Sequence, residues 1–407
     1  ADVTGSAVDP SILGADGEIC FYGRPIEDKY DGPAVYRLSF EGGGLPVAKR
    51  SVLAPQDTPP VSTVTRETVL GADAFYNDMA PGGDEMDRWF DSTLYGAGAT
   101  KSHVLSLPPT TLATPADVEV SVNPLFEAAE NPDHCIELMV NSDSWGEQCW
   151  DGAGMALLRY SPPQMPLPLG LTVGENTLTL RAKAAGADYY DIDFLRIRYC
   201  TELSSAAFDG QLLGRVGRGD LRAAGFQSPS ISVWDVSFPE EPTILQGFSV
   251  FESAGLYDVS WVGGGERHVA CTDDSDWLQA REMLLNERSE LFDEDNEADL
   301  LMLTRPLFVE AAERLALLRR EQGLSVRVVT WEEIRTQFGG GLENPEGLRR
   351  FVAYARSSWS KKPRYLLLVG DGTSDPRDYR GLDEQDVMVP TKLLYLEEEQ
   401  SRAMEAP

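Results

Sequence analysis

Residues 298–304 read Ala-Asp-Leu-Leu-Met-Leu-Thr, a nearly unbroken apolar run that follows a strongly acidic stretch. Such a run is typical of a strand that is buried on both faces, as in a parallel sheet. Pro306 comes next, at a position typical of the first residue of a helix. Gly323 is placed to end that helix, and residues 324–330 then form a second apolar run. The expected inward face of the helix consists of Leu307, Ala311, Leu315 and Leu318.

The following residues continue the same alternation of strand and helix. Thr330 and Glu333 have the spacing of a capping box, which predicts a short helix that ends at the glycines of 339–341. Asn344 and Pro345 open another helix with an apolar face. Residues 365–369 form a third apolar run and lead directly into Gly-Asp-Gly at 370–372. Strand, helix, strand, helix and strand with short connections predict a parallel α/β sheet.

The residues before 298 predict β structure. Short alternating runs recur with turn residues between them, which favours a β-sandwich of jelly-roll type over residues 61–203. We expect four parts in all: an N-terminal β segment at 1–60, this sandwich, a β-rich segment with a helical connector near 277–286 at 204–297, and an incomplete α/β region at 298–407. The strands expected in the sandwich are 102–107, 117–122, 135–140, 154–159, 176–182 and 194–199.

Alternation within these runs predicts which side chains are buried. Residues 118–122 alternate valine with Glu119 and Ser121, so we expect a buried valine face and a face toward solvent. Asp191 and Asp193 also alternate with apolar residues, and we expect both to face solvent. The alternative for these two aspartates is a role in binding sugar or calcium.

The charge limits the partners. The chain has 66 acidic and 35 basic side chains, a formal net charge of −31, which disfavours nucleic acid and anionic membrane surfaces. No stretch has the length of a membrane-spanning helix, so membrane insertion is not expected. The chain begins Ala-Asp-Val, as a mature chain does after removal of a targeting segment, and we expect it to be secreted or at the cell surface.

The cysteines and histidines do not predict a catalytic pair within this chain. None of the five cysteines lies in a C-x-x-C pair, and Cys135 and Cys149 flank a predicted turn where a disulfide is plausible in an exported protein. His268 and Cys271 lie three residues apart on an expected strand and therefore point to opposite faces. His134 and Cys135 are adjacent and also diverge. We expect no catalytic and no cofactor-binding residue here.

One loop has a pattern that metal ions use. Asp371, Asp375 and Asp378 lie within eight residues, directly after the third strand of the parallel sheet. Loops at the carboxyl ends of parallel strands line ligand crevices, and carboxylate oxygens are the ligands that Ca²⁺ prefers. The sequence leaves two interpretations open, a calcium site formed by these three residues and a plain acidic turn.

Several of these blocks resemble one family. Residues 298–304, 318–326, 345–359 and above all 363–372 (Pro-Arg-Tyr-Leu-Leu-Leu-Val-Gly-Asp-Gly) are similar to the start of the catalytic region of gingipain-like cysteine peptidases, peptidase family C25. Looser similarity extends upstream, and it includes Asp-Arg-Trp-Phe at 87–90 and Ile-Ser-Val-Trp-Asp-Val at 231–236.

The resemblance implies a caspase-like α/β fold, a cysteine nucleophile with a histidine, stabilisation by calcium and secretion. In that family the histidine lies in a His-Gly element and the cysteine follows a later strand. This sequence has no His-Gly pair and stops 36 residues after Asp371. We therefore expect the catalytic dyad on a downstream segment of the same precursor, which is the expected partner together with a protein or peptide substrate. The alternative is a surface binding or structural protein with a carbohydrate- or protein-binding jelly roll and an inactive α/β domain.

Overall fold

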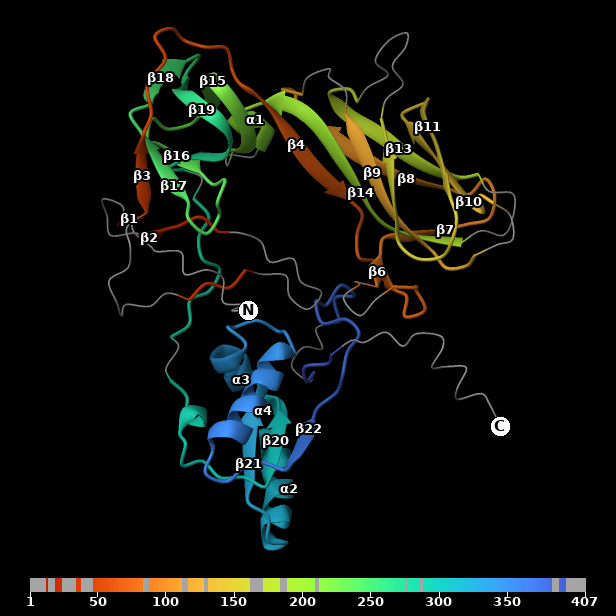
Figure 1. The fold of residues 1–407 in the computed structure, drawn as a ribbon, viewed down its shortest axis with the longest axis vertical. Helices are drawn as coiled ribbons and strands as arrows, with labels where there is room; N and C mark the ends of the chain where they lie inside the picture. The colour runs from red at the N-terminus through yellow and green to blue at the C-terminus, as the bar shows by residue number, and fades with distance from the viewer. Residues whose placement is uncertain are drawn as a thin grey trace.

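The computed structural model places two β bodies beside each other and an α/β body below them (Figure 1). A two-stranded ribbon of β1 (Ile12–Leu13) and β2 (Ile19–Cys20) lies near the amino terminus. The structure describes residues 12–13, 19–23, 34–37, 47–82, 86, 88–111, 116–127, 131–161, 171–183, 189–208, 212–275, 277–285, 288–382 and 388–392.

The α/β body is built on the apolar run of residues 298–304. That run is β20 (Leu300–Thr304), which pairs in parallel with β21 (Val326–Thr330) on one side and β22 (Tyr365–Val369) on the other. The predicted strand–helix alternation is therefore confirmed. The helical elements are η1 (Glu290–Phe292), η2 (Pro306–Phe308), α2 (Val309–Glu321), α3 (Trp331–Phe338) and α4 (Glu346–Ser358).

Local signals set the ends of these helices as predicted. The hydroxyl of Thr330 accepts a hydrogen bond from the amide of Glu333, 3.4 Å away, and so caps α3. The Asn344 side chain accepts from the amide of Glu346 at 2.9 Å and does the same for α4. Gly323 ends α2 with a φ of +90°, a backbone conformation that glycine adopts at little cost.

The buried face of α2 differs from the prediction. Ala312 and Ala316 are buried, whereas Leu307 and Leu318 are 65% and 56% exposed. Two alanines one turn apart let the helix lie close to the sheet. Of the four residues predicted to face inward, Leu315 packs on the same cluster as Ala316, while Leu307, Ala311 and Leu318 are exposed. Apolar periodicity alone could not distinguish the two faces because both carry apolar residues.

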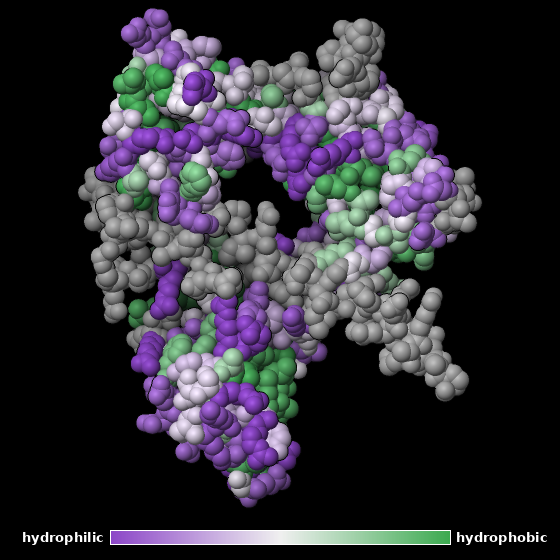
Figure 2. All heavy atoms as spheres, in the orientation of Figure 1, coloured by the Kyte–Doolittle hydropathy of each residue, from purple (hydrophilic) through white to green (hydrophobic). Residues whose placement is uncertain are grey.

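The two faces of the sheet are covered unequally. Helix α4 packs Phe351, Ala355 and Trp359 against β20 and β21, and loss of a buried ring such as Phe351 costs about 3–5 kcal/mol. Strand β22 lies beyond this cover. Its Tyr365, Leu366 and Leu368 side chains are 51%, 43% and 43% exposed, and Figure 2 shows a hydrophobic patch on this side of the α/β body.

The sandwich consists of two antiparallel sheets that share one apolar core. Residues from both sheets meet in it, among them Val120 from one and Leu138 from the other. All six expected strands are present. One sheet has the order β11 (Asp143–Trp150), β10 (His134–Val140), β13 (Gly174–Ala182) and β8 (Thr100–Leu107). The other has β12 (Ala156–Tyr160), β9 (Asp117–Pro124), β14 (Tyr189–Glu202) and β4 (Thr63–Leu70), with β7 (Ser92–Tyr95) paired to β14.

The part of this second sheet's outer face that lies on β9 and at the start of β14 is buried, which corrects the solvent face expected for Glu119, Ser121 and Asp191. Glu119 and Ser121 are 2% and 0% exposed, and Asp191 is also fully buried, while Asp193 is half-buried. Part of the cover is the short hairpin of β5 (Phe75–Tyr76) and β6 (Trp89–Phe90), whose flanking residues bond to Asp191 and Asn123. Alternation along a strand does not reveal such cover because it comes from another segment.

The other β body has the strand order β15 (Leu212–Phe226), β19 (Leu256–Asp273), β16 (Ile231–Asp235), β17 (Thr243–Gln246) and β3 (Ala48–Ser51), so a strand from the first sixty residues adds to it. The expected helical connector is wrong, since residues 277–285 form no helix. None of the described helices is long and apolar enough to cross a membrane. This body also contains the short helix α1 (Ser205–Phe208) and the strand β18 (Ser249–Ser253), which pairs with β19.

Asp299 joins the amino ends of the three parallel strands. Its Oδ2 accepts hydrogen bonds from Lys361 Nζ at 2.5 Å and from the amide and hydroxyl of Ser325, both at 2.9 Å. The bond from Lys361 is the main cause that lowers the pKa of Asp299 to about 2. A lowered pKa stabilises the folded state above the carboxyl's ordinary pKa of 3.8, and this contribution is lost as the pH falls through about 2.

We therefore predict that Asp299→Asn lowers the free energy of unfolding at neutral pH and that the difference from wild type shrinks as the pH falls toward 2. Urea unfolding at a series of pH values measures it. Glu310→Gln, which removes an exposed pair with Arg314 on α2, is the control and should have little effect at any pH. An Asp299→Asn deficit that stays constant with pH would contradict the assignment.

Candidate functional site

The carboxyl ends of the three parallel strands meet at one edge of the sheet, where α/β proteins place their ligand sites. The loop that follows β22, residues 371–382 (the carboxyl-edge loop), lies there. Residues 388–392 return to the same edge, where the Val389 amide donates to the carbonyl oxygen of Asp371 at 2.8 Å. The edge is therefore formed by segments far apart in the sequence.

Arg305 is a buried cation that links several segments of this edge. It follows β20 directly and is only 6% exposed. Its guanidinium donates to the carbonyl of Met388 at 2.5 Å, to Glu332 at 2.7 Å and to Glu343 at 3.4 Å. Glu343 also accepts from the indole N–H of Trp331 at 2.5 Å. The buried guanidinium of Arg305 is thus paired with the carboxylates of Glu332 and Glu343, and an unpaired buried charge would cost stability. A small hollow beside it is lined by Arg305, Glu343, Thr373, Pro376, Met388 and Val389.

The three aspartates of the carboxyl-edge loop bond to the loop's own backbone. Asp371 accepts from the Gly372 amide at 2.8 Å, and Asp378 accepts from the Leu382 amide at 2.8 Å. Asp375 is 7% exposed, and its two oxygens accept from the amides of residues 379 and 380 at 2.9 and 3.0 Å. Such hydrogen bonds from backbone amides to aspartate side chains are typical of a turn. They favour the interpretation of this loop as a plain acidic turn.

The carboxylates of Asp371, Asp375 and Asp378 do not converge on one point in this conformation. Among the described residues, one group of three histidine, cysteine or acidic side chains brings its ligand atoms within 4.8 Å of one another, and it consists of Cys135, Glu147 and Cys149. A calcium site in the carboxyl-edge loop would require the aspartates to move, and it stays a prediction.

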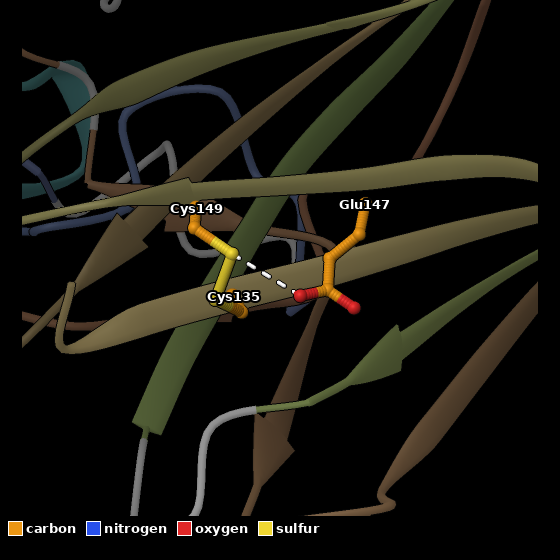
Figure 3. Close-up of side chains that lie close together, drawn as sticks. All are labelled: Cys135, Glu147 and Cys149. Carbon is orange, nitrogen blue, oxygen red and sulfur yellow. Dashed lines mark hydrogen bonds between the residues drawn. A yellow bond between two sulfur atoms is a disulfide. The ribbon is translucent and has the colours of Figure 1, made fainter.

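The cysteine group is a disulfide with a glutamate beside it. Cys135 and Cys149 are opposite each other on β10 and β11 and are bonded, which confirms the plausible pair (Figure 3). Glu147 Oε1 lies 3.2 Å from Cys149 Sγ. A disulfide sulfur carries no proton and is a poor ligand for metal ions, so the group is not a metal site while the disulfide is intact.

The histidines have structural surroundings. His103 Nε2 lies 3.0 Å from a carboxylate oxygen of Asp91, and His134 packs beside the rings of Trp150 and Tyr190. His268 is exposed, whereas Cys271 on the same strand is buried, as expected from their odd spacing. Burial raises the pKa of the Cys271 thiol to about 12, so it carries no thiolate at neutral pH.

A comparison with known protein families matches the part of the chain that contains the α/β body. The family model for peptidase family C25 matches residues 293–405. This region of the chain is of peptidase family C25. The C25 region begins shortly before β20 and contains the parallel sheet and its carboxyl edge.

A solved structure extends the likeness upstream, as fold alone. The structure of dimeric latent PorU from Porphyromonas gingivalis is 16% identical, covers 83% of this chain and gives a TM-score of 0.60. The chain spans about a third of PorU, 32% of its length. A CBM36-1 domain of a xylanase from the hindgut metagenome of Trinervitermes trinervoides covers 32% of this chain and 96% of its own at 17% identity, with a TM-score of 0.22. No curated protein matches the sequence.

Two residues of this edge were missed by sequence reasoning. Arg305 follows β20 immediately, and a charged residue directly after a buried strand is a usable signal. Trp89 lies in a block already noted for its similarity to the C25 family, but nothing in the sequence places it near residue 374. The structure does so with a hydrogen bond from its indole N–H to the Ser374 carbonyl.

The calcium hypothesis predicts a measurable change in thermal stability. If the aspartates bind Ca²⁺, millimolar calcium raises the Tm of the chain, and Asp371→Asn removes the increase because this exposed carboxylate would lose its charge. Asp57→Asn, an exposed aspartate far from the loop in sequence, is the control. A Tm that calcium leaves unchanged in the wild type would favour the plain acidic turn.

Proposed function

We propose that this chain is the front part of a secreted, gingipain-like cysteine endopeptidase whose catalytic histidine and cysteine lie on a downstream segment of the same precursor. In this proposal the sandwich is of jelly-roll type, and the C25 region is the first half of a caspase-like α/β domain. The expected substrate is a protein or peptide. The family match supports the reaction class, and the chain's own sheet supports the need for a second segment.

The observation that carries the proposal is the exposure of β22. The strand reads Tyr-Leu-Leu-Leu-Val, yet three of its five side chains are at least 43% exposed. The neighbouring strand β20 is buried at the same positions. Leu301 and Leu303, which lie opposite Leu366 and Leu368, are each 1% exposed. Within the described residues β22 pairs with β20 alone among the strands, so its other edge is open to a further strand.

The direct test of function uses a polypeptide that extends through the downstream coding sequence. We expect it to cleave peptides in a reaction that iodoacetamide abolishes, since the nucleophile would be a thiolate, whereas the 407-residue chain should show no such cleavage. An extended polypeptide that folds but shows no thiol-dependent cleavage would contradict the proposal. It would support the alternative of a surface binding or structural protein.

Substitutions on β22 test the cover independently of catalysis. Leu366→Lys should change the free energy of unfolding of the 407-residue chain by no more than about 1 kcal/mol, because the side chain is half exposed there. In the extended polypeptide the same change should destabilise strongly, because it would bury an unpaired charge. Leu301→Lys, its register partner on β20, should unfold both forms and serves as the matched control. Equal effects of Leu366→Lys in both forms would mean that β22 gains no cover.

A further inference from the structure

The carboxyl-edge loop is in contact with the sandwich through one tryptophan. Trp89, the first residue of β6, is 2% exposed, and its indole N–H donates to the carbonyl of Ser374 at 3.2 Å. Its ring lies 4.9 Å from the ring of Tyr379, and the Arg380 guanidinium lies 5.3 Å above it. A hydrogen bond, an aromatic pair and a cation–π contact therefore meet on one side chain, 285 residues before Ser374.

On the loop side, a buried carboxylate shapes the turn that presents these groups. Asp375 accepts hydrogen bonds from the amides of Tyr379 and Arg380, whose side chains contact the Trp89 ring. The Asp375 amide in turn donates to the hydroxyl of Thr373 at 2.8 Å. These hydrogen bonds hold the shape of the turn without Trp89. Contact with Trp89 therefore fixes the position of the turn and not its shape.

On the sandwich side, the hairpin that carries Trp89 is tied to the sheet by buried polar residues. The Asn77 side chain donates to Asp191 at 2.5 Å, and Thr93 donates to the other oxygen of Asp191 at 3.1 Å. The Asn123 side chain donates to the carbonyl of Pro81 at 3.2 Å. Asp191 and Asn123 are both 0% exposed and lie opposite each other on β14 and β9. The hairpin is thus anchored to the rigid sheet at two neighbouring points.

We infer that the hairpin of β5 and β6, as described by residues 71–82 and 88–90, acts as a strut through which the sandwich positions the carboxyl-edge loop, with Trp89 as the positioning residue. A role of Trp89 in catalysis rests on the proposed function, because the loop lies where the peptidase site would be completed. The role of Trp89 in holding the loop is independent of the proposed function. The sandwich thereby sets the geometry of the carboxyl edge of the parallel sheet.

Limited proteolysis of the 407-residue chain tests the strut without any catalytic assay. Trypsin can cut the loop after Arg377 and Arg380, and such cleavage requires the loop to leave its docked conformation. We expect Trp89→Ala to speed these two cleavages about tenfold or more, Trp89→Phe to speed them less because the ring remains, and Tyr379→Ala to act like Trp89→Ala. The double variant should be no faster than Trp89→Ala. Tyr95→Ala, an exposed ring elsewhere on the sandwich, is the control and should leave both rates unchanged.

Cleavage after Arg377 and Arg380 at the wild-type rate in both Trp89→Ala and Tyr379→Ala would overturn the inference. If Trp89→Ala accelerates cleavage throughout the chain because the hairpin unfolds, Tyr379→Ala decides, since that residue lies on the loop and leaves the hairpin intact.

In the extended polypeptide, Trp89→Ala should raise KM about tenfold while kcat changes less, and Trp89→Phe should restore most of the loss. Unchanged kinetics would overturn the catalytic role but not the docking. Absence of peptidase activity in the wild-type extended polypeptide would remove the proposed function, and the trypsin result would still decide the strut.

Discussion

A parallel strand composed of Tyr-Leu-Leu-Leu-Val needs cover on both faces and a partner along each edge, because apolar area and unpaired backbone groups are both costly in water. Strand β20 has all of this cover and β22 has about half of it. The difference in exposure between these two neighbouring strands of similar composition is the basis of our proposal that a further segment completes the sheet. The family assignment of residues 293–405 and the short span of this chain relative to PorU are consistent with it.

The same constraint explains how the β bodies relate to the α/β body. The site edge is formed by loops, which are free to move unless something holds them. Here a buried cation, Arg305, holds residue 388 from within the α/β body, and Trp89 holds residues 374–380 from the sandwich. Through these contacts the sandwich contributes to the geometry of the site edge.

Much of the α/β body could be predicted from the sequence because its signals are local. Gly323 and the pair of Thr330 and Glu333 lie within a few residues of the helix ends that they set. The buried face of α2 was predicted wrongly because the choice between Ala316 and Leu318 depends on how closely the helix approaches the sheet. A helix was expected near residues 277–286 because of their composition, but the described part of that segment, residues 277–285, forms no helix.

The site was less predictable because its contacts join distant segments. Asp191 was expected in solvent, and its burial comes from a hairpin more than a hundred residues earlier. Hydrogen exchange at the β22 amides tests the central claim most directly. The account predicts fast exchange at the open edge in the 407-residue chain and exchange slower by about 100-fold or more in the extended polypeptide. Equal, slow exchange in both would show that this sheet is already complete.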